Sequence, residues 1–595
     1  MGKRFITVII IIALVAFAIR LSVCRELCVN DPQVAMPSNV TDMATYMDCA
    51  RKIMSGEYSG EFYYQPFYYA VFLPLAHLMF GKSIWAVLIM QSLAGALTVY
   101  IAAIISARIW GRVAGIATAL LMTFSAAHIF YTPYMLLEVL QGFWIILLLY
   151  ELMNAVKYKK WIYWVLCGLI AGMAILTRGN AWFFVPLLIA AAFYSVRRRP
   201  GFPAKILPVI ILIVFILLPQ LPFIIHNTKV LGKLSGPSTA SAAVLALGNT
   251  PEAPPGGRNP GLGPGPMEYP LSYHIWMKKK DEISIPSQIL KWFREEPLAF
   301  IELTFRKMLL FWDYREIPNN IAFESNALKS PLLGILGFIP SSVIISLAIA
   351  GMLFFLKAAI KKFNIFILFY FVIAFWLAVS AFYILARFRV PGIPLLSVFA
   401  GGFSGYIVYY LRKRGFEKFL RKSLPPLFFG VMICFSFYEI YRTCFEAPLM
   451  RLARPNGVSV EISPTEKMIL DNGPFTFGGW TLYKAPEGAV IEKKFSDVAN
   501  GNYKNAKLSL SLFWENPGTA EFIINGEKKS VKSDKTGMME HEFDIPFPKD
   551  LNVRIQTLSM KNASFGFDTQ RDYRRTLVNG EDIGAELICR IFCFK

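Results

Sequence analysis

WAVLIMQSLAGALTVYIAAIISA, residues 85–107, is a run of 23 residues without a charged side chain. An α-helix rises about 1.5 Å per residue, so this run is long enough to cross the roughly 30 Å hydrocarbon core of a bilayer. Comparable runs recur along the chain, which is 55% hydrophobic. The sequence therefore predicts a polytopic α-helical membrane protein.

We expect about eleven transmembrane helices. They are predicted near residues 5–24, 85–107, 112–131, 135–153, 161–176, 181–196, 204–225, 332–356, 363–385, 391–411 and 424–444. The apolar run 67–80 is shorter and contains Pro74, so we interpret it as an interfacial or re-entrant helix.

Lys and Arg gather in alternate loops of this arrangement, for example at 157–160 and 197–199. Basic residues in short loops stay on the cytoplasmic side, which predicts a cytoplasmic N-terminus. The large loops 25–84 and 226–331 and the tail then face outward. We expect the chain to lie in a bacterial inner membrane with these parts in the periplasm. The net charge of +21 follows from this topology and gives no reason to expect a nucleic-acid partner.

The sequence divides into a membrane core, residues 1–445, and a tail, residues 446–595. In the tail, long apolar runs give way to short alternating ones such as Leu-Ser-Leu-Ser-Leu at 508–512, and Asn525-Gly526 predicts a hairpin turn. We therefore expect a periplasmic β-sandwich-like domain. Its aromatic residues include Trp480, Tyr483 and Trp514. We interpret them first as core residues, with stacking on carbohydrate as the alternative.

The outer loop 226–331 has two distinct parts. Residues 250–266 are dense in Pro and Gly, which excludes a helix or a central strand and predicts a segment that orders on binding. Residues 287–312 mix apolar and charged side chains at helical spacing. That mixture predicts an interfacial amphipathic helix.

Acidic residues near the outer membrane surface are the first candidates for chemistry. Asp42 and Asp48 lie in the first outer loop, and Glu138 stands at the start of an apolar span. A carboxylate at a membrane interface is costly to bury, so each must be compensated or used. Glu138 either hydrogen-bonds a tyrosine or the backbone, or faces Asp42 as a second active-site acid.

Three arginines lie on the outer side, where the charge rule disfavours them: Arg178, Arg387 and Arg389. One such arginine alone is explained by snorkelling to lipid headgroups or by a salt bridge. Two separate sites facing an acidic loop favour a different interpretation, since guanidinium groups bind phosphate through paired hydrogen bonds. The pattern predicts a site for an anionic, phosphate-bearing ligand.

These residues belong to an ordered series: Asp42-x3-Tyr46-x3-Ala50, Gly56, Gln65-Pro66-Phe67-Tyr68, Glu138, Leu176-Thr177-Arg178, Asn227 before Gly232, Gly248-Asn249, and Arg387-Phe388-Arg389-x-Pro391. The series resembles the polytopic C-type glycosyltransferases, above all the bacterial branch related to protein O-mannosyltransferases and to the aminoarabinose transferase that modifies lipid A. The resemblance covers residues 1–445. It departs at His226-Asn227, where many relatives carry Arg-Asn, so a titratable group replaces a fixed charge.

The resemblance implies transfer of a sugar, with inversion, from a polyprenyl-phosphate donor to a lipid, glycan or protein acceptor outside the cytoplasm. By position, Asp42 matches the acid that acts in the family as general base or orients the acceptor. Asp48 is the second choice for the base, on a different helical face from Asp42, and Glu138 is expected to position the acceptor, a cation or the neighbours of Asp42.

Arg387 is the leading candidate ligand of the donor phosphate, supported by Arg178 and Arg389. The remaining expected substrate-loop residues are Tyr46, Tyr68, His226, Asn227 and Asn249. Five histidines without a close His/Cys group predict no metal site. Asp42 with Glu138 leaves a divalent cation open as a cofactor.

Other classes of function stay open. A polymerase or ligase of lipid-linked glycans is the nearest enzymatic alternative. A non-catalytic transporter or flippase for polyprenyl-linked sugars would also carry intramembrane charges. Transporters of that kind usually show two related halves, and no internal repeat is evident here, so the large acidic outer loops favour an enzyme that works beside membrane lipids.

Overall fold

The apolar runs form helices, as their length and composition predict. The computed structural model describes residues 2–37, 41–196, 202–251, 253–256, 271–278, 280, 282–335, 338–446, 448–449, 458–463, 467–471, 480–494, 505–546, 552–568, 575–582 and 586–594. Within these ranges, the helices long and apolar enough to cross a membrane are Lys3–Asn30, Ile84–Trp110, Glu138–Tyr158, Ile206–Leu231, Ser341–Lys361, Phe363–Ser380, Ala386–Lys413 and Phe416–Phe445. The protein is therefore a polytopic integral membrane protein.

Shorter apolar helices account for the other predicted spans. They are Phe67–Phe80, Arg112–Thr123, Trp161–Thr177 and Gly179–Ser195. Phe67–Phe80 is the run interpreted from sequence as interfacial or re-entrant, and the other three fall on predicted crossings. The total of eleven spans stays a prediction.

Most predicted spans differ from the structure by a few residues at their ends, and two differ for a clear physical reason. The run 112–131 is broken after α6 (Arg112–Thr123), because backbone hydrogen bonds join Phe124 and Ala126 to Ile339, and α7 (Ala126–Phe130) follows. The run 332–356 begins too early. Pro340 has an extended backbone and precedes α19 (Ser341–Lys361), since proline is excluded from a helix interior but tolerated at its start.

The chain divides into two compact units. The first comprises Met1–Ser241, Pro264–Pro266 and Met308–Tyr438, and the second Ala242–Gly263, Met267–Lys307 and Glu439–Lys595. The second unit thus includes part of the predicted outer loop as well as the tail, while the predicted boundary after residue 445 stays a prediction.

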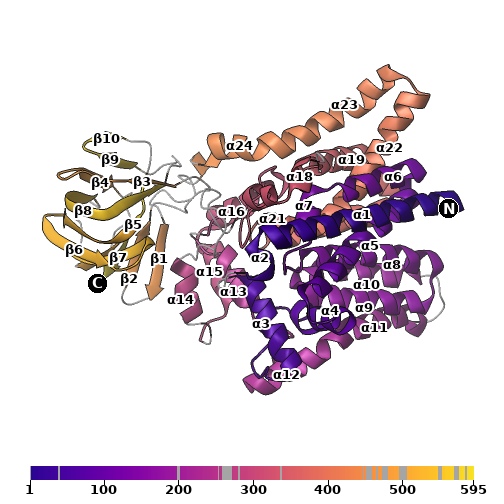
Figure 1. Cartoon of the computed structure of the whole chain (residues 1–595), viewed down its shortest axis with the longest axis horizontal. Helices are drawn as coiled ribbons and strands as arrows, with labels where there is room; N and C mark the ends of the chain where they lie inside the picture. The colour runs from indigo at the N-terminus through magenta and orange to yellow at the C-terminus, as the bar shows by residue number, and fades with distance from the viewer. Residues whose placement is uncertain are drawn as a thin grey trace. The chain divides into compact units, whose positions relative to one another are not determined.

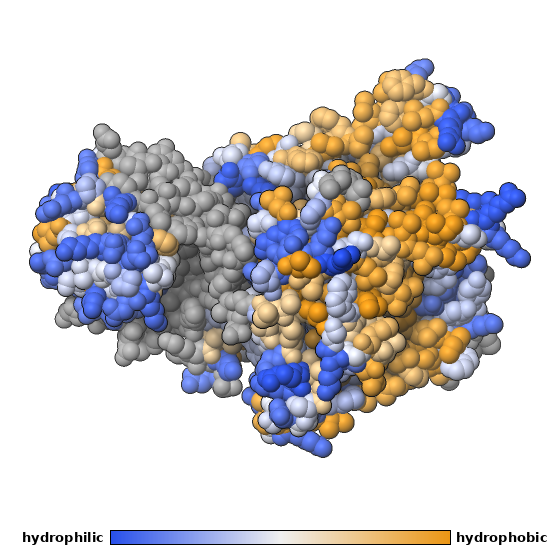
Figure 2. All heavy atoms as spheres, in the orientation of Figure 1, coloured by the Kyte–Doolittle hydropathy of each residue, from blue (hydrophilic) through white to orange (hydrophobic). Residues whose placement is uncertain are grey.

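The first unit is helical (Figure 1). Its helices are α1 (Lys3–Asn30), α2 (Pro32–Ala35), α3 (Asp42–Ser55), η1 (Phe67–Phe72), α4 (Leu73–Phe80), α5 (Ile84–Trp110), α6, α7, α8 (Glu138–Tyr158), α9 (Trp161–Thr177), η2 (Gly179–Phe184), α10 (Val185–Ser195), α11 (Phe202–Leu217), η3 (Leu218–Gln220), α12 (Leu221–Leu231), α17 (Phe323–Asn326), η5 (Ala327–Lys329), α18 (Pro331–Ile335), α19, α20 (Phe363–Ser380), α21 (Ala386–Arg389), η6 (Val390–Gly392), α22 (Ile393–Lys413), α23 (Phe416–Met432) and η7 (Ile433–Phe437). Figure 2 shows a broad hydrophobic surface over this unit, as a lipid-facing surface requires.

The predicted amphipathic helix at 287–312 is two helices, α15 (Ile285–Glu295) and α16 (Pro297–Trp312). Pro297 starts the second helix, in the position where proline is tolerated. Trp292 of α15 is buried with Ala299 and Leu303 of α16, whereas neighbouring apolar side chains such as Phe293 are exposed. Most of the predicted Pro/Gly segment 250–266 lies outside the described residues.

The tail forms an antiparallel sheet, as predicted. Its strands are β1 (Val458–Ser463), β2 (Lys467–Asp471), β3 (Trp480–Tyr483), β4 (Val490–Lys494), β5 (Asn505–Ile524), β6 (Glu527–Ser533), β7 (Gly537–Pro546), β8 (Asn552–Asp568), β9 (Arg575–Val578), β10 (Glu581–Asp582), β11 (Glu586–Leu587) and β12 (Cys589–Phe594). The main path runs β1-β2-β12-β5-β8-β4-β9-β10, with β6 and β7 paired to β5. All described strands therefore share one hydrogen-bonded network. Asn525 and Gly526 both have positive φ at the predicted hairpin turn.

Trp514 is fully buried in the core of this sheet, which fits the core interpretation of that residue. Trp480 and Tyr483 are not among the residues whose side chains the structure describes, so their predicted role stays a prediction. The indole Nε1 of Trp514 donates a hydrogen bond to Nε2 of His541 over 2.9 Å. His541 must accept this bond in its neutral form, and burial lowers the pKa of its imidazole.

We expect the sheet to lose stability as the pH falls below about 6.5, the ordinary histidine value. A lowered folded-state pKa means that the unfolded chain binds the proton more readily, so protonation favours unfolding. Thermal melts of the full chain at pH 7.5 and 5.5 measure this. The His541→Gln variant keeps an acceptor without titrating, so its melting temperature should fall less between these pH values; an equal fall in both proteins would contradict the prediction.

Candidate active site

Helix α3 places Asp42 in its first turn. The Thr41 hydroxyl oxygen caps the helix by accepting a hydrogen bond from the backbone N–H of Ala44 over 3.4 Å, and Gly56 ends the helix with φ of 75°. The free backbone N–H groups and the positive end of the helix dipole stabilise a carboxylate at Asp42.

The guanidinium of Arg387 lies between two carboxylates from distant parts of the chain. Its Nη2 is 2.5 Å from Oδ2 of Asp42, which is 345 positions away, and its Nε is 4.0 Å from Oε1 of Glu138. That same Oε1 accepts a hydrogen bond from Nη2 of Arg178 over 3.0 Å. Asp42, Arg387, Glu138 and Arg178 thus form an alternating chain of opposite charges, hereafter the charge cluster.

The charge cluster is balanced and largely buried. Two carboxylates face two guanidinium groups, and the exposed fraction of the side chain rises from 0% for Glu138 through 9% for Arg387 and 17% for Arg178 to 24% for Asp42. Buried charges are stable only when paired in this way. Asp42 is the most open member, so the cluster is most accessible from its side.

Phe388 supports both arginines. Its ring centroid lies 4.1 Å from Cζ of Arg178 and 5.1 Å from Cζ of Arg387. Cations are attracted to an aromatic face, so one ring helps to hold two like charges close together. This role of Phe388 was not predicted from sequence, although its place between Arg387 and Arg389 was a signal.

The hydrogen-bonding capacity of the cluster is not exhausted. Among the described residues, Oε2 of Glu138 and Nε of Arg387 have no hydrogen-bond partner, although both atoms are buried. Buried polar groups normally find partners, so the cluster can accept a hydrogen bond from a ligand and donate another. Nearby, Gln141 and Asn180 also carry buried, unpartnered amide atoms, and neither was predicted from sequence.

Tyr46 lies one helical turn after Asp42, as its spacing predicts. Its ring is 5.5 Å from Tyr68 and 5.9 Å from Tyr69, so it belongs to a buried aromatic group. Burial, with a smaller contribution from the Asp42 carboxylate, raises the pKa of the Tyr46 phenol well above its ordinary value. Tyr46 is therefore protonated at neutral pH and is not a base.

Tyr68 has a packing role. Its hydroxyl donates to Oε1 of Gln91 over 2.7 Å, and Nε2 of Gln91 donates to the carbonyls of Thr132 and Tyr134. Tyr68 is fully buried. These bonds join η1, α5 and the segment that leads to Glu138.

Asp48 does not reach the charge cluster. It lies on a different face of α3, as predicted, with 43% of its side chain exposed, and it pairs with Arg51 and Lys52 at 2.6 Å each. Hydrogen bonds from Lys52 and Arg51 lower the pKa of its carboxyl group. The geometry gives Asp48 no support as an alternative base.

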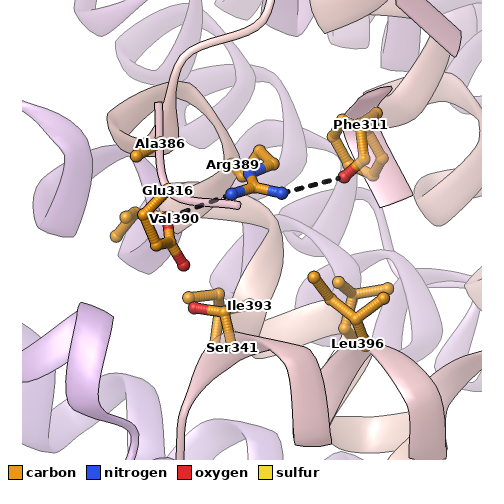
Figure 3. Close-up of a pocket in the computed structure, with 9 residues that line it drawn as sticks. Phe311, Glu316, Ser341, Ala386, Arg389, Val390, Ile393 and Leu396 are labelled. Atoms are coloured by element: carbon orange, nitrogen blue, oxygen red, sulfur yellow. Dashed lines mark hydrogen bonds and ion pairs between the residues drawn. The ribbon is translucent and has the colours of Figure 1, made fainter. Parts of the chain in front are cut away.

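Arg389, a predicted phosphate ligand, also lies apart from the cluster. Its guanidinium donates to the backbone carbonyls of Asp313 and Arg315 and pairs with Glu316 at 3.0 Å. Figure 3 shows it beside a small cavity, reaching toward Glu316 and Phe311. The two arginines of the motif therefore have different partners. Arg387 contacts two carboxylates, whereas Arg389 binds the backbone and side chain of a loop.

We expect Arg389→Leu to destabilise the protein by about 3–5 kcal/mol. The substitution leaves the carboxylate of Glu316 and several backbone carbonyls without their hydrogen-bond donor. Thermal unfolding of the purified protein measures the loss. Arg389→Lys should recover only part of it, since an ammonium cannot reproduce the planar fork. An unchanged melting temperature for Arg389→Leu would show that the hydrogen bonds from Arg389 to the loop do not stabilise the protein.

The other predicted substrate-loop residues hold the backbone. His226 Nε2 lies 2.8 Å from the Gly60 carbonyl, and buried Asn227 bonds both the N–H and the carbonyl of Phe62. In the second unit, Oδ1 of Asn249 accepts a hydrogen bond from Lys307 over 3.0 Å. Neither His226 nor Asn227 contacts a member of the charge cluster among the bonds and ion pairs identified for the described residues of the first unit.

Metal binding gains no support from the geometry. In the part of the chain that the structure describes, no three His, Cys, Asp or Glu side chains come close enough to hold an ion. The Asp42 carboxylate is paired with a guanidinium instead. The divalent cation therefore stays a prediction, which a chelator would test.

Residues 64–226 match the family model of dolichyl-phosphate-mannose-protein mannosyltransferases. The match confirms the predicted resemblance to C-type glycosyltransferases. It includes Glu138 and Arg178 but neither Asp42 nor Arg387, so the family segment supplies half of the charge cluster. No curated protein matches the chain in sequence.

The chain is similar to parts of several membrane glycosyltransferases of known structure. The oligosaccharyltransferase of Archaeoglobus fulgidus is 15% identical with a TM-score of 0.39, over 76% of this chain and 55% of that one. ArnT of Cupriavidus metallidurans, bound to undecaprenyl phosphate, is 16% identical with a TM-score of 0.35, over 69% and 64%. The arabinosyltransferase EmbB of Mycobacterium smegmatis is 11% identical with a TM-score of 0.28, over 97% and 64%. The chain thus spans under two thirds of each of these proteins.

Proposed function

We propose that this protein transfers a sugar from a polyprenyl-phosphate donor to an acceptor hydroxyl on the outer face of a bacterial inner membrane, with inversion. The observation that carries the proposal is the charge cluster, in which the partly exposed carboxylate of Asp42 contacts the buried guanidinium of Arg387. A base for the acceptor and a cation for the departing phosphate are the two groups that such a transfer needs. The match of residues 64–226 to the mannosyltransferase family supports it.

In the proposed reaction Asp42 accepts the proton of the acceptor hydroxyl. The acceptor oxygen then forms a bond to the anomeric carbon of the sugar, while the bond from that carbon to the phosphate oxygen breaks. The bonding electrons leave with the polyprenyl phosphate, and Arg387 and Arg178 stabilise the negative charge that it gains. The products are the glycosylated acceptor and the free lipid phosphate.

Glu138 has a supporting part in this proposal. It binds both arginines through one oxygen and so fixes their separation. Arg387 is also bound to Asp42. A donor phosphate that takes over Arg387 would release Asp42, so the base would become free only when the donor is present.

The test is a transfer assay with the purified full chain in lipid nanodiscs. Radiolabelled polyprenyl-phosphate sugars are offered with a crude envelope fraction as acceptor, with and without EDTA. We expect transfer of label to the acceptor fraction, and an effect of EDTA would reveal a divalent cation. The sugar-free polyprenyl phosphate should inhibit the transfer as a product.

Alternative functions predict different results in the same assay. A polymerase or ligase would use glycans linked through pyrophosphate in place of the single-phosphate donors. A flippase would bind the donors without turning them over, and labelled lipid would cross the bilayer of proteoliposomes. Donor binding with no turnover in any acceptor fraction would contradict the proposed transfer.

A further inference from the structure

Gln141 is a buried polar side chain that the fold leaves without a partner. Its exposed fraction is 0%, and among the described residues neither Oε1 nor Nε2 of its amide has a hydrogen-bond partner. It lies on α8 among buried apolar residues such as Val139 and Leu140. A buried amide without partners costs free energy, so packing alone gives no reason for a glutamine here.

Gln91 on α5 shows what a structural glutamine looks like in the same unit. It is equally buried, but its Oε1 accepts a hydrogen bond from Tyr68 and its Nε2 donates to the carbonyls of Thr132 and Tyr134. Gln91 therefore holds three segments together. Gln141 makes no comparable bond within the described chain.

Gln141 lies beside the charge cluster. It follows Glu138 by three positions on α8, and residues at that spacing are neighbours on a helix surface. The adjacent Gly142 faces η6, the turn after Arg387: a Cβ on Gly142 would lie 3.4 Å from Cα of Pro391. Gln141 thus follows Glu138, which carries the unpartnered Oε2, by about one helical turn.

The unpartnered atoms of these residues and of the charge cluster include both acceptors and donors. The acceptors are Oε2 of Glu138, Oε1 of Gln141 and, two residues after Arg178, Oδ1 of Asn180, and the donors are Nε2 of Gln141 and Nε of Arg387. A phosphate offers only acceptors at neutral pH and would leave these oxygens without partners. Hydroxyl groups, which both donate and accept, match the set.

We infer that Gln141, together with Oε2 of Glu138, binds hydroxyl groups of the transferred sugar. The inference rests on the proposed function and assigns the sugar-binding part of the same site. In this arrangement the amide of Gln141 donates to one hydroxyl and accepts from another, while the arginines hold the phosphate. Gln141 is then a specificity-determining residue, because a donor that lacks these hydroxyls leaves the amide unpaired.

The experiment compares the affinities of the full chain in nanodiscs for a sugar-free polyprenyl phosphate and for its mannose, glucose and aminoarabinose derivatives. The sugar-dependent gain is the ratio of the Kd of the sugar-free lipid to the Kd of the tightest derivative. We expect Gln141→Leu to lower this gain about tenfold, through loss of two hydrogen bonds, with the Kd of the sugar-free lipid unchanged. Gln141→Asn should recover part of the gain.

Thermal stability separates this role from a structural one. Gln141→Leu should melt at or above the wild-type temperature, because it removes an unpaired amide, whereas the matched Gln91→Leu should melt lower. The inference is overturned if Gln141→Leu keeps the full gain, or if no sugar raises affinity above that of the sugar-free lipid. If wild type binds none of these lipids, the proposed function fails and the inference fails with it.

Discussion

Asp42→Asn should lower kcat for sugar transfer by about 10³-fold, within the range that a general base contributes. Asparagine keeps the size of the side chain and an oxygen for Arg387, but it cannot accept the proton of the acceptor. Donor affinity should be equal to or tighter than that of wild type, because Arg387 no longer faces a full negative charge at 2.5 Å. Single-turnover transfer and donor titration measure the two effects separately.

The matched control is Asp48→Asn, the same change six positions along α3. Its carboxylate is at the surface, bound to Arg51 and Lys52, so transfer should stay within about twofold of wild type, as for most surface substitutions. If Asp42→Asn keeps full activity, the proposed base is wrong. If both variants lose donor binding together, the first outer loop has a folding role instead.

Arg387→Gln should abolish detectable transfer and raise the Kd for sugar-free polyprenyl phosphate by about 10- to 100-fold, the range for losing a hydrogen bond to a charged group. It should also cost about 3 kcal/mol of stability, because Asp42 and Glu138 are left with Arg178 alone. Ligand titration and thermal unfolding measure these effects.

A double variant separates the two consequences of that change. Arg387→Gln combined with Asp42→Asn restores the charge balance, so the melting temperature should recover in part while transfer stays absent. Recovery of transfer in the double variant would show that Arg387 serves only to neutralise Asp42. An unchanged Kd for the lipid phosphate in Arg387→Gln would place the phosphate elsewhere.

Sequence reasoning found the members of the charge cluster because each is a charge that the predicted topology makes costly. Glu138 opens an apolar span, Arg178 and Arg387 lie on the side that the charge rule disfavours in that topology, and Asp42 is predicted at the membrane interface. It ranked Arg387 above Arg389 but kept both as ligands of the phosphate. The two share one motif, and only the loop at 313–316, brought to Arg389 by folding, distinguishes them.

Gln141 was missed for a related reason. A polar residue within an apolar span is common, and Gln91 has the same surroundings in sequence. What differs is whether carbonyls and hydroxyls from other helices reach the amide. Hydrogen-bond partners that distant segments provide leave no local pattern.

The sequence by itself determined the membrane helices, the change to strands in the tail and the charged residues that became site candidates. Each of these follows from the local period and polarity of the chain. The tertiary structure alone decided that Asp42 pairs with Arg387, that Phe388 supports two arginines and that Arg389 holds a loop. Ion pairs act over a few ångströms in space, and the sequence separation of their members, 345 positions for Asp42 and Arg387, carries no record of that distance.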